Sequence, residues 1–262
     1  MKLIEAHNHL HDARLLPHLA GILPTLNLQC AVVNGTSERD WSAVAALAAR
    51  HSWVLPSFGL HPWHVAERSS GWLEDLHRRL DAHPGAGVGE IGLDGWIEGH
   101  DLADQTDVFT AQLAIAAERN LPVTIHCIQA WGALWKILRT HPLPARGFLL
   151  HAYGGSMEMM RELAKKGACF SFSPYFLHER KAAQRAVFAA IPEDRLLVET
   201  DAPDLRPPDD QNPHPLHDEN GARLNHPANI EVAYEALAKI RGMGAKTLTP
   251  IVAANFLRLF GR

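Results

Sequence analysis

Cysteine is scarce in this sequence. The 262 residues include three, Cys30, Cys127 and Cys169, which lie far apart and form no Cys-x-x-Cys pair. The sequence therefore indicates neither a disulfide framework nor a zinc ribbon. Unpaired thiols are typical of a reducing compartment, so we expect a cytoplasmic protein.

Long apolar runs are also missing. Nowhere do 18 apolar residues follow one another, and Glu5, His7 and His9 interrupt the stretch that a signal peptide would need to keep apolar. We therefore expect no membrane span, no membrane partner and no export.

An excess of positive charge is the third absence. The chain has 25 Lys and Arg against 29 Asp and Glu, which gives a formal net charge of -4. This balance excludes a strongly basic nucleic-acid-binding protein, although a local basic groove is compatible with an acidic average. With 47% hydrophobic residues the chain can bury a large core, and we expect residues 1–262 to form a single domain.

Familiar catalytic motifs are absent as well. The sequence has no Gly-x-Ser-x-Gly and no His-Glu-x-x-His, which excludes the familiar serine hydrolases and zincin proteases. Gly87, Gly89 and Gly92 match the dinucleotide-binding spacing, but they lie inside a predicted strand, so we treat the match as accidental. Neighbouring strand residues face opposite sides, so we expect the Cys127 thiol to point away from any site that His126 enters.

What the sequence does have is a regular alternation of short β-rich runs and stretches with the spacing of a helical face. The predicted strands are 2–6, 30–33, 53–58, 87–91, 122–125, 147–150, 168–172 and 196–199. This alternation predicts a parallel sheet. Eight strands with about eight helices favour a TIM-like (β/α)8 barrel over a doubly wound open sheet, which periodicity alone does not exclude.

Two features of the C-terminal part stand apart from this alternation. The stretch from Pro203 to Pro227 is rich in Pro, Asp, Asn and His and lacks periodicity, so we expect a long functional loop. Thr249 followed by Pro250 predicts the N-cap and first turn of the last helix.

Residues that can bind a metal or move a proton end most of the predicted strands. They are His7, His9, His61, Glu90, His126, His151 and Asp201. Because the carboxyl ends of parallel barrel strands meet at one face, we expect these side chains to converge there, where barrel enzymes have their active sites.

Chance and structural roles compete with this interpretation. Seventeen histidines give about one His-x-His pair by chance, and a single histidine at a strand end is more often a hydrogen-bonded structural residue. Ligand-type residues at the ends of several predicted strands nevertheless favour a metal or catalytic site. We interpret His11, past the strand end, as a surface or structural residue. His61 precedes a proline and fits a simple turn as well as a role in orienting a ligand or transferring a proton.

The mixture of residues indicates the chemistry. Imidazole and carboxylate groups suit zinc, manganese or a similar divalent ion such as magnesium, and four histidines with two acids can hold two ions with one carboxylate bridging them. Two ions about 3.5–4 Å apart generate a hydroxide and stabilise the leaving oxygen of an ester or phosphate. The sequence therefore predicts a hydrolase with two divalent metal ions.

A set of motifs spans nearly the whole chain. They are His7-x-His9, GLHP, GEIGLD, AQLAIAAERNLPVTIH, LLHAYGG, ETDAPDL, Asn225-x-Pro227 and NFLRLFG. Together they resemble the TatD-type metal-dependent hydrolases, a branch of the amidohydrolase-like barrels. Members of that family are often deoxyribonucleases that act on DNA ends, so the resemblance implies DNA as a partner.

The resemblance also implies a ligand set. His7, His9, Glu90 and Asp201 would hold one metal, and Glu90 would bridge it to a second metal that His126 and His151 complete. Asp201 would also orient or deprotonate the attacking water.

Several positions depart from the family pattern. Glu5 replaces the usual Asp, Ile128 and Asn220 replace two usual arginines, and Gly154 with Gly155 replaces a more usual Ser-Gly. Because the arginine fork grips two phosphate oxygens, the loss of two arginines should weaken binding of a nucleic-acid backbone.

Two groups of residues near the expected site are candidates for substrate contacts. Arg206 and Arg223 in the long loop could replace the missing arginines. Trp63, Trp96 and Trp131 follow the third, fourth and fifth strands, where they could stack bases, enclose a small apolar substrate, or only pack between loops.

Three hypotheses follow. The first is a TatD-like nuclease that cleaves phosphodiester bonds. The second is a metal-dependent amide, ester or lactone hydrolase of a small molecule, motivated by Ile128 and Asn220. The third is a metal-stabilised binding protein without catalysis.

Overall fold

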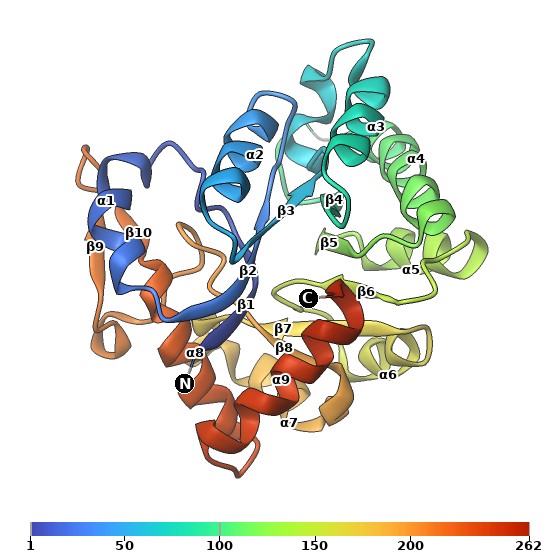
Figure 1. Cartoon of the computed structure of the whole chain (residues 1–262). Coiled ribbons are helices and arrows are strands. Elements are labelled where there is room, and N and C mark those ends of the chain that lie inside the picture. The colour runs from blue at the N-terminus through green and yellow to red at the C-terminus, as the bar shows by residue number, and fades with distance from the viewer. Residues whose placement is uncertain (1, 100, 262) are drawn as a thin grey trace.

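Eight parallel strands form the centre of the molecule and helices surround them, which confirms the predicted (β/α)8 barrel (Figure 1). The computed structural model describes residues 2–99 and 101–261. The strands follow one another around the sheet in chain order. They are β1 Leu3–Asn8, β2 Leu28–Asn34, β3 Val54–Phe58, β4 Gly87–Asp94, β5 Val123–Ile128, β6 Phe148–Leu150, β7 Ala168–Phe172 and β8 Leu196–Val198.

Helices connect these strands on the outside of the barrel. The α-helices are α1 Leu19–Ile22, α2 Trp41–Arg50, α3 Trp72–Ala82, α4 Leu102–Arg119, α5 Trp131–Thr140, α6 Met157–Lys165, α7 Ala182–Ala190, α8 Ile230–Ile240 and α9 Ala245–Phe260. Short 3-10 helices lie between them: η1 Leu16–His18, η2 Leu23–Thr25, η3 Pro62–Glu67, η4 Pro174–Leu177, η5 Glu179–Lys181, η6 Glu193–Arg195, η7 Asp209–Gln211 and η8 Pro227–Asn229.

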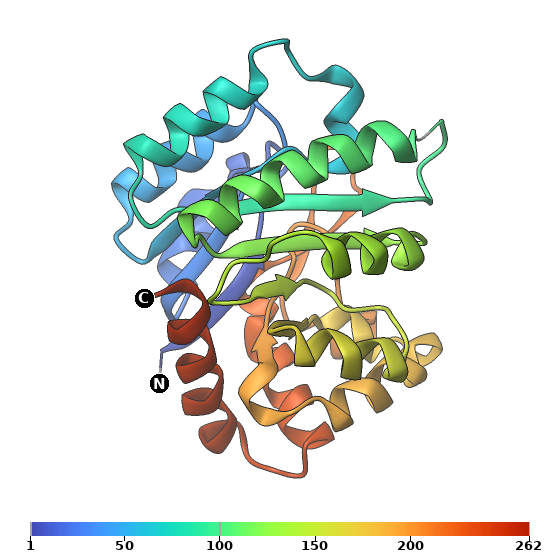
Figure 2. The same cartoon turned by 90° about the vertical axis from the view of Figure 1, so that its right-hand side faces the viewer.

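Backbone hydrogen bonds join the two ends of the sheet. The Asp201 amide donates to the His7 carbonyl at 3.1 Å, and the His9 amide donates to the Ala202 carbonyl at 2.8 Å. Both bonds lie at the carboxyl ends of the strands, whereas β1 begins and α9 ends at the opposite end of the barrel (Figure 2). The closure therefore fixes the backbone of His9 and Asp201 at the face where barrel enzymes do chemistry.

Helix α4 shows how a helix is held against this sheet. Phe109, Gln112, Leu113 and Ala116 recur at helical spacing and are all buried. The Gln112 amide is satisfied inside this apolar face, because its Oε1 accepts from the Leu60 N–H at 2.7 Å and its Nε2 donates to the Leu60 carbonyl at 3.2 Å. The helix thereby anchors the segment that follows β3.

Gly92 permits the close approach of β4 and β5. Its φ is +148°, and a Cβ at this position would lie 2.0 Å from the His126 carbonyl oxygen. Any side chain here would displace the β5 backbone at His126. The GVGEIG stretch is thus strand from Gly87 onward, which agrees with the interpretation of its glycine spacing as accidental.

The structure corrects two sequence-based expectations about where elements begin and end. Strand β4 does not end at Glu90 but continues to Asp94, so Glu90 lies in mid-strand, where the pairing register with β5 shifts. Helix α9 begins at Ala245, not at Thr249, because the Thr249 hydroxyl bonds to the Ala245 carbonyl inside the helix and Pro250 loses only one helical bond near the N-terminus.

The stretch from Pro203 to Pro227 contains more order than its composition predicts. Two short antiparallel strands, β9 Pro215–His217 and β10 Arg223–Asn225, form a hairpin within it. The Asp218 carboxylate closes the turn by accepting from the amides of Asn220 and Ala222. Gly221 has a φ of +80°, which suits glycine.

Tyr234 connects helix α8 to the first strand. Its buried hydroxyl donates to the Ile4 carbonyl at 2.9 Å and accepts from the Ile4 amide at 3.3 Å. We expect Tyr234→Phe to lower the free energy of unfolding by about 1–3 kcal/mol, because it removes a buried partner from the backbone. Urea unfolding followed by tryptophan fluorescence measures this difference. The control Tyr175→Phe, whose hydroxyl contacts the exposed Arg180, should change stability by no more than about 0.5 kcal/mol, and equal losses in both would contradict the assignment.

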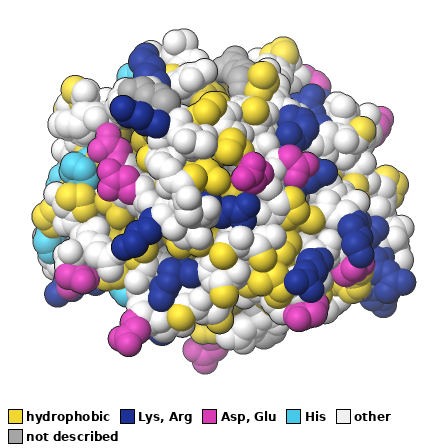
Figure 3. Space-filling view, turned by 90° about the horizontal axis from the view of Figure 1, so that it is seen from below, with side chains coloured by type: hydrophobic (Ala, Val, Ile, Leu, Met, Phe, Trp, Pro, Cys, Tyr) yellow, Lys and Arg dark blue, Asp and Glu magenta, His cyan; other side chains and the backbone are white. Residues whose placement is uncertain are grey.

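Charges of both signs are interspersed on the face of the molecule seen from below (Figure 3). Lysines and arginines alternate there with acidic side chains, and hydrophobic areas lie between them. This face therefore lacks the broad basic area of a strongly cationic nucleic-acid-binding protein. In the described part of the chain, no helix combines the length and apolar character that crossing a bilayer requires.

Candidate metal centre

Six buried ligand-type side chains converge inside the carboxyl end of the barrel. Each exposes at most 9% of its surface. They are His7 in β1, His9 just after it, Glu90 in β4, His126 in β5, His151 after β6 and Asp201 after β8. With His61, they form three overlapping groups whose ligand atoms lie within 4.8 Å of one another in each group.

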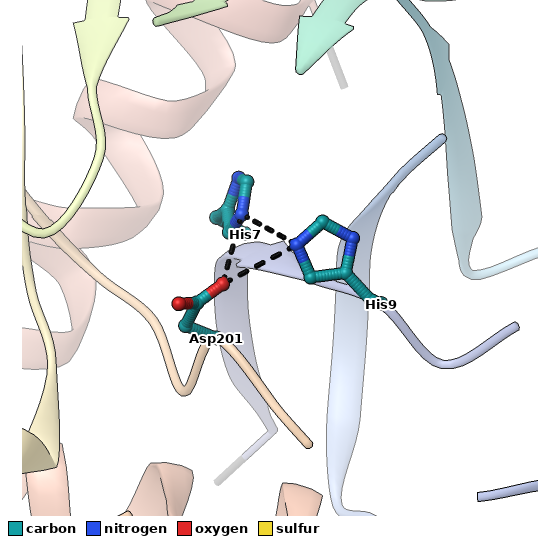
Figure 4. A group of neighbouring side chains, drawn as sticks. All are labelled: His7, His9 and Asp201. Carbon is teal, nitrogen blue, oxygen red and sulfur yellow. Dashed lines mark hydrogen bonds and ion pairs between the residues drawn. The ribbon is translucent and has the colours of Figure 1, made fainter. Parts of the chain in front are cut away.

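His7, His9 and Asp201 make up the first group (Figure 4). Asp201 Oδ1 lies 3.0 Å from His7 Nε2 and 3.4 Å from His9 Nε2, and the two nitrogens are 3.2 Å apart. Both histidines point to the same side because their positions differ by two along an extended chain. The backbone of Asp201 is in the left-handed conformation, with a φ of 58°.

Glu90 lies between this group and the other histidines. Its Oε2 is 3.3 Å from His7 Nε2 and 3.2 Å from His9 Nε2. Its Oε1 is 3.0 Å from His126 Nδ1 and 2.7 Å from His151 Nε2. Each oxygen of one carboxylate thus faces a different pair of histidines, which is the arrangement that a bridging ligand requires.

His61, the N-cap residue of η3, approaches the same carboxylate. Its Nε2 is 3.4 Å from Glu90 Oε1, and its Nδ1 accepts from the Trp63 amide at 3.1 Å. This second contact makes Nδ1 the acceptor, so a neutral ring carries its proton on Nε2 and directs it into the site. Burial lowers the pKa of His61 to about 4, which keeps the ring neutral near pH 7.

Partners behind the histidines orient their rings. His9 Nδ1 lies 2.8 Å from the Asn34 carbonyl and can only donate to it, which leaves the Nε2 lone pair facing the site. His126 Nε2 lies 3.0 Å from Asp94 Oδ2, so Nδ1 is the nitrogen that faces Glu90. Carboxylate or carbonyl partners of this kind are typical of metal-binding histidines.

The Asn34 side chain supports the same orientation for His7. Its amide lies 2.9 Å from His7 Nδ1, and its Oδ1 has no partner although it is buried. The two ends of an amide have nearly the same shape, and an amide turned so that Oδ1 accepts from Nδ1–H satisfies both groups. His7 would then also present the Nε2 lone pair to the site.

The donor set fits divalent metal ions. Two pairs of ring nitrogens face each other at 3.2 Å, His7 with His9 and His126 with His151. Two unprotonated nitrogens repel at this distance, and a cation between them removes the repulsion. Imidazoles with two carboxylates suit zinc, manganese or similar ions.

The histidines of the cluster keep its two carboxylates, Glu90 and Asp201, negatively charged. Burial by itself raises the pKa of Glu90, but His151, His61 and His7 outweigh it and hold that pKa well below the usual range. Burial by itself also raises the pKa of Asp201, but the contacts with His7 and His9 outweigh it and lower that pKa overall. Both acids are therefore ionised carboxylates.

The histidines respond in the opposite direction. Burial lowers the pKa of His9, yet its contacts with Asp201 and Glu90 raise it well above the usual value. Burial also lowers the pKa of His151, and Glu90 with Glu199 raises it overall. Metal ions and protons thus compete for the same nitrogens.

Sequence reasoning missed three residues around this cluster. They are Asn34, Asp94 and Glu199, all fully buried. The Glu199 carboxylate accepts from the Ala152 amide at 2.8 Å and from the Ser171 hydroxyl, beside His151. The signal for Glu199 was its spacing of two residues from Asp201, which places both on one side of an extended chain.

Glu5 is a structural residue in this arrangement. It is fully buried, and its Oε1 accepts from the Thr200 amide at 2.7 Å and from the Thr200 hydroxyl. Thr200 directly precedes Asp201. Glu5, which departs from the family pattern, therefore holds the segment after β8 in place through its hydrogen bonds with Thr200.

We expect Asp94→Asn to weaken metal binding about 10- to 100-fold, because the amide no longer holds His126 with a charge-assisted hydrogen bond. Titration calorimetry with manganese measures the loss directly. Asp107→Asn is the matched control, since it removes one exposed carboxylate from helix α4. Equal affinities in Asp94→Asn and the control would show that Asp94 does not orient the ligand.

A cavity of about 710 Å³ opens above the cluster. Its wall includes Trp63, Trp96 and Trp131, which supports the sequence-based placement of these rings at the mouth. Trp63 is 46% exposed and Trp96 is 64% exposed, although Trp63 also donates from Nε1 to Asp94 at 2.7 Å. Exposed indoles around a pocket mark it as a surface for a ligand.

Cys127 and His11 are both buried. Cys127 follows His126 in β5 and is part of the cavity wall. Burial raises the pKa of the Cys127 thiol to about 12, which excludes a reactive thiolate near pH 7. His11 has its Nε2 3.4 Å from Asp40 Oδ2, which agrees with the structural alternative of the sequence-based interpretation and excludes the surface one.

Arg206 and Arg223 do not reach the cavity wall. Both guanidinium groups contact the carboxylate of Asp209, Arg223 at 2.5 Å. A sequence cannot show such pairing, because it depends on how the long loop folds. The expectation that these two arginines replace the missing cations therefore receives no support from their positions.

Comparisons with known proteins agree with one another. A sequence model of the family described as "TatD related DNase" matches residues 4–261. The "3'-5' ssDNA/RNA exonuclease TatD" of Erwinia tasmaniensis is 31% identical over 231 residues, which cover 87% of each chain. The "Uncharacterized metal-dependent hydrolase YabD" of Bacillus subtilis is 27% identical over 98% of each chain.

Solved structures show the same architecture. The crystal structure of YJJV, a TatD homologue from Escherichia coli k12, superposes with a TM-score of 0.89 at 25% identity and covers 99% of this chain and 98% of that one. A TatD family hydrolase from Entamoeba histolytica has a TM-score of 0.86 at 17% identity over 99% and 98% of the two chains, and shows the fold alone.

Proposed function

Since the chain belongs to the family of TatD related DNases, we propose that it is a two-metal hydrolase that cleaves phosphodiester bonds at the ends of single-stranded nucleic acid. The observation that carries this proposal is Glu90, whose two oxygens face two different pairs of histidines. Relatives named as exonucleases for single-stranded DNA and RNA support the substrate and a 3'-to-5' direction.

His7, His9, Glu90 and Asp201 would hold one ion, and Glu90, His126 and His151 the second. When bound, two divalent ions supply a nucleophile at neutral pH and charge stabilisation for the phosphoryl oxygens. Zinc, manganese and magnesium are the candidate ions.

The side chains of this protein provide the remaining functions. Asp201 is ionised and has its Oδ1 in the site, so it would accept the proton of the attacking water. His61 carries its proton on Nε2 and lines the cavity, so it would donate a hydrogen bond to a phosphate oxygen. The indoles of Trp63 and Trp96 would stack bases that pass over the mouth.

A small-molecule amide, ester or lactone is the second candidate substrate. Ile128, where the family pattern has an arginine, is 37% exposed and lines the cavity, which favours an apolar group at that wall. Asn220, the other departure, is exposed on the β9–β10 turn and does not line the cavity. A binding protein without catalysis is the third candidate, and relatives named as an exonuclease and as a metal-dependent hydrolase argue against it.

A substrate panel separates these candidates. The purified protein with manganese is given a single-stranded oligonucleotide, a small activated phosphodiester, and a set of amides, esters and lactones. We expect hydrolysis of both phosphodiesters, with the oligonucleotide preferred. Hydrolysis of an amide, ester or lactone alone would replace the proposal with the second candidate.

The three free, buried cysteines fit a reducing compartment, so we propose the cytoplasm as the location.

A further inference from the structure

The segment after β7 forms one wall of the cavity. Tyr175, Phe176, Lys181 and Gln184, from η4 through the start of α7, all line it. Among the cavity-lining residues that the structure describes, Lys181 is the single lysine or arginine. The charge available to a phosphate at this mouth, apart from the metal cluster, therefore comes from this wall.

Lys181 is half-buried and lies above the ring of Tyr175. Its ammonium nitrogen is 4.9 Å from the ring centre, and within the described residues it forms no ion pair with a carboxylate. Arg180 holds the same tyrosine, because its Nη2 donates to the phenol oxygen at 2.6 Å. The tyrosine thus places the ammonium, and the charge stays available to a ligand.

Three arginines near the mouth already have carboxylate partners. Arg206 and Arg223 share Asp209. Arg14 contacts the carboxylates of Asp12 at 2.7 Å and Asp204 at 2.8 Å. Each of these arginines would have to give up an existing ion pair before it could bind a phosphate, whereas Lys181 would not.

Lys181 and the exposed indoles lie on opposite walls. In a ring of eight strands, β7 is four strands from β3, which precedes Trp63, and three from β4, which precedes Trp96. The metal-ligating side chains lie inside the barrel between these walls. A strand of nucleic acid that crosses the mouth would meet aromatic faces on one side and the ammonium on the other.

We propose that Lys181 binds the phosphate next to the scissile one, and thereby supplies a cation to a cavity that has Ile128 where the family pattern has an arginine. The inference rests on the proposed phosphodiesterase function and assigns its substrate-binding cation. A phosphate oxygen is the natural acceptor for an ammonium held in this way, because Lys acts on phosphate as a point charge.

The position of Lys181 predicts which kinetic constants it affects. A contact with the neighbouring phosphate forms in the bound substrate and in the transition state alike, so its loss raises KM and leaves kcat nearly unchanged. A substrate with a single phosphate cannot make the contact. The effect should therefore depend on the length of the substrate.

The test compares Lys181→Gln with Lys166→Gln in the manganese-loaded protein. Lys166 is also half-buried and lies 5.9 Å from a ring centre, that of Trp135, but it follows α6 and does not line the cavity. On a single-stranded oligonucleotide, Lys181→Gln should raise KM on the order of tenfold. It should also reduce the slope of log(kcat/KM) against log[salt] by about 0.7, the share of one phosphate contact in a single strand.

Two comparisons complete the design. Hydrolysis of bis(p-nitrophenyl) phosphate, which has one phosphate, should be the same in wild type and Lys181→Gln. Lys181→Arg should recover most of the oligonucleotide KM because it keeps the charge. An unchanged KM and salt slope in Lys181→Gln, or an equal loss on both substrates, would overturn the inference while the proposed function stands. A wild-type protein that cleaves neither phosphodiester would instead refute the proposed function, and the inference with it.

Discussion

Asp201→Asn is expected to lower kcat about 10²- to 10⁴-fold, the range for removing a positioned proton acceptor. The carboxylate is buried, and its contacts with His7 and His9 keep it ionised. The amide has the same shape but cannot take a proton from water, and it is a poorer metal ligand. Initial rates on a small phosphodiester, with the fold checked by thermal melting, measure the effect.

The control for this prediction is Asp194→Asn. Asp194 is exposed in η6 and does not line the cavity, so its loss should leave kcat unchanged. Full turnover in Asp201→Asn would contradict the role of Asp201 as the proton acceptor, and a wild-type protein without turnover on any substrate would support a binding protein without catalysis. A parallel loss in both variants would point to a general effect of the charge change.

Removal of metal is the second large effect. Dialysis against a strong chelator should reduce hydrolysis to background, and manganese should restore it. Because ions bind the folded site, saturation at about 100 times Kd stabilises the fold by about 2.7 kcal/mol. For a chain of this length that corresponds to a rise in Tm of about 5–10 °C between the stripped and loaded protein.

Glu90→Gln separates this effect from unspecific binding of metal. Loss of the bridging carboxylate should abolish both the activity and most of the metal-dependent rise in Tm, because both groups of histidines depend on it. Glu118→Gln changes an exposed residue of α4 and should retain both. A chelator-insensitive enzyme, or a Glu90→Gln variant with the full rise in Tm, would contradict the two-metal arrangement.

The positions of the ligand-type residues could be predicted from the sequence, because in a parallel barrel the end of every strand lies at the same face. Strands of period two that end in His7, His9, His126 or His151 must present these side chains at one face. The same logic placed Asp201 after the last strand. The prediction needed only the alternation of elements, not the details of packing.

The partners of these residues were not readable in the same way. Asn34 and Asp94 orient histidines of other strands, and such contacts depend on register and on the irregular pairing around Glu90. The ion pairs of Arg206 and Arg223 with Asp209 depend on the fold of the long loop. The Thr249–Pro250 pair is a local signal for a helix start, but α9 begins before it. The proline is tolerated inside the helix because it costs only one backbone hydrogen bond.

The most direct test of the account follows the products of one substrate over time. A single-stranded oligonucleotide labelled at its 5' end is incubated with the manganese-loaded protein, and the products are resolved by length. The account predicts a ladder that shortens by one nucleotide at a time from the 3' end, and no ladder with chelator or with Asp201→Asn. An intact oligonucleotide, under conditions in which the same protein hydrolyses an amide, ester or lactone, would contradict it.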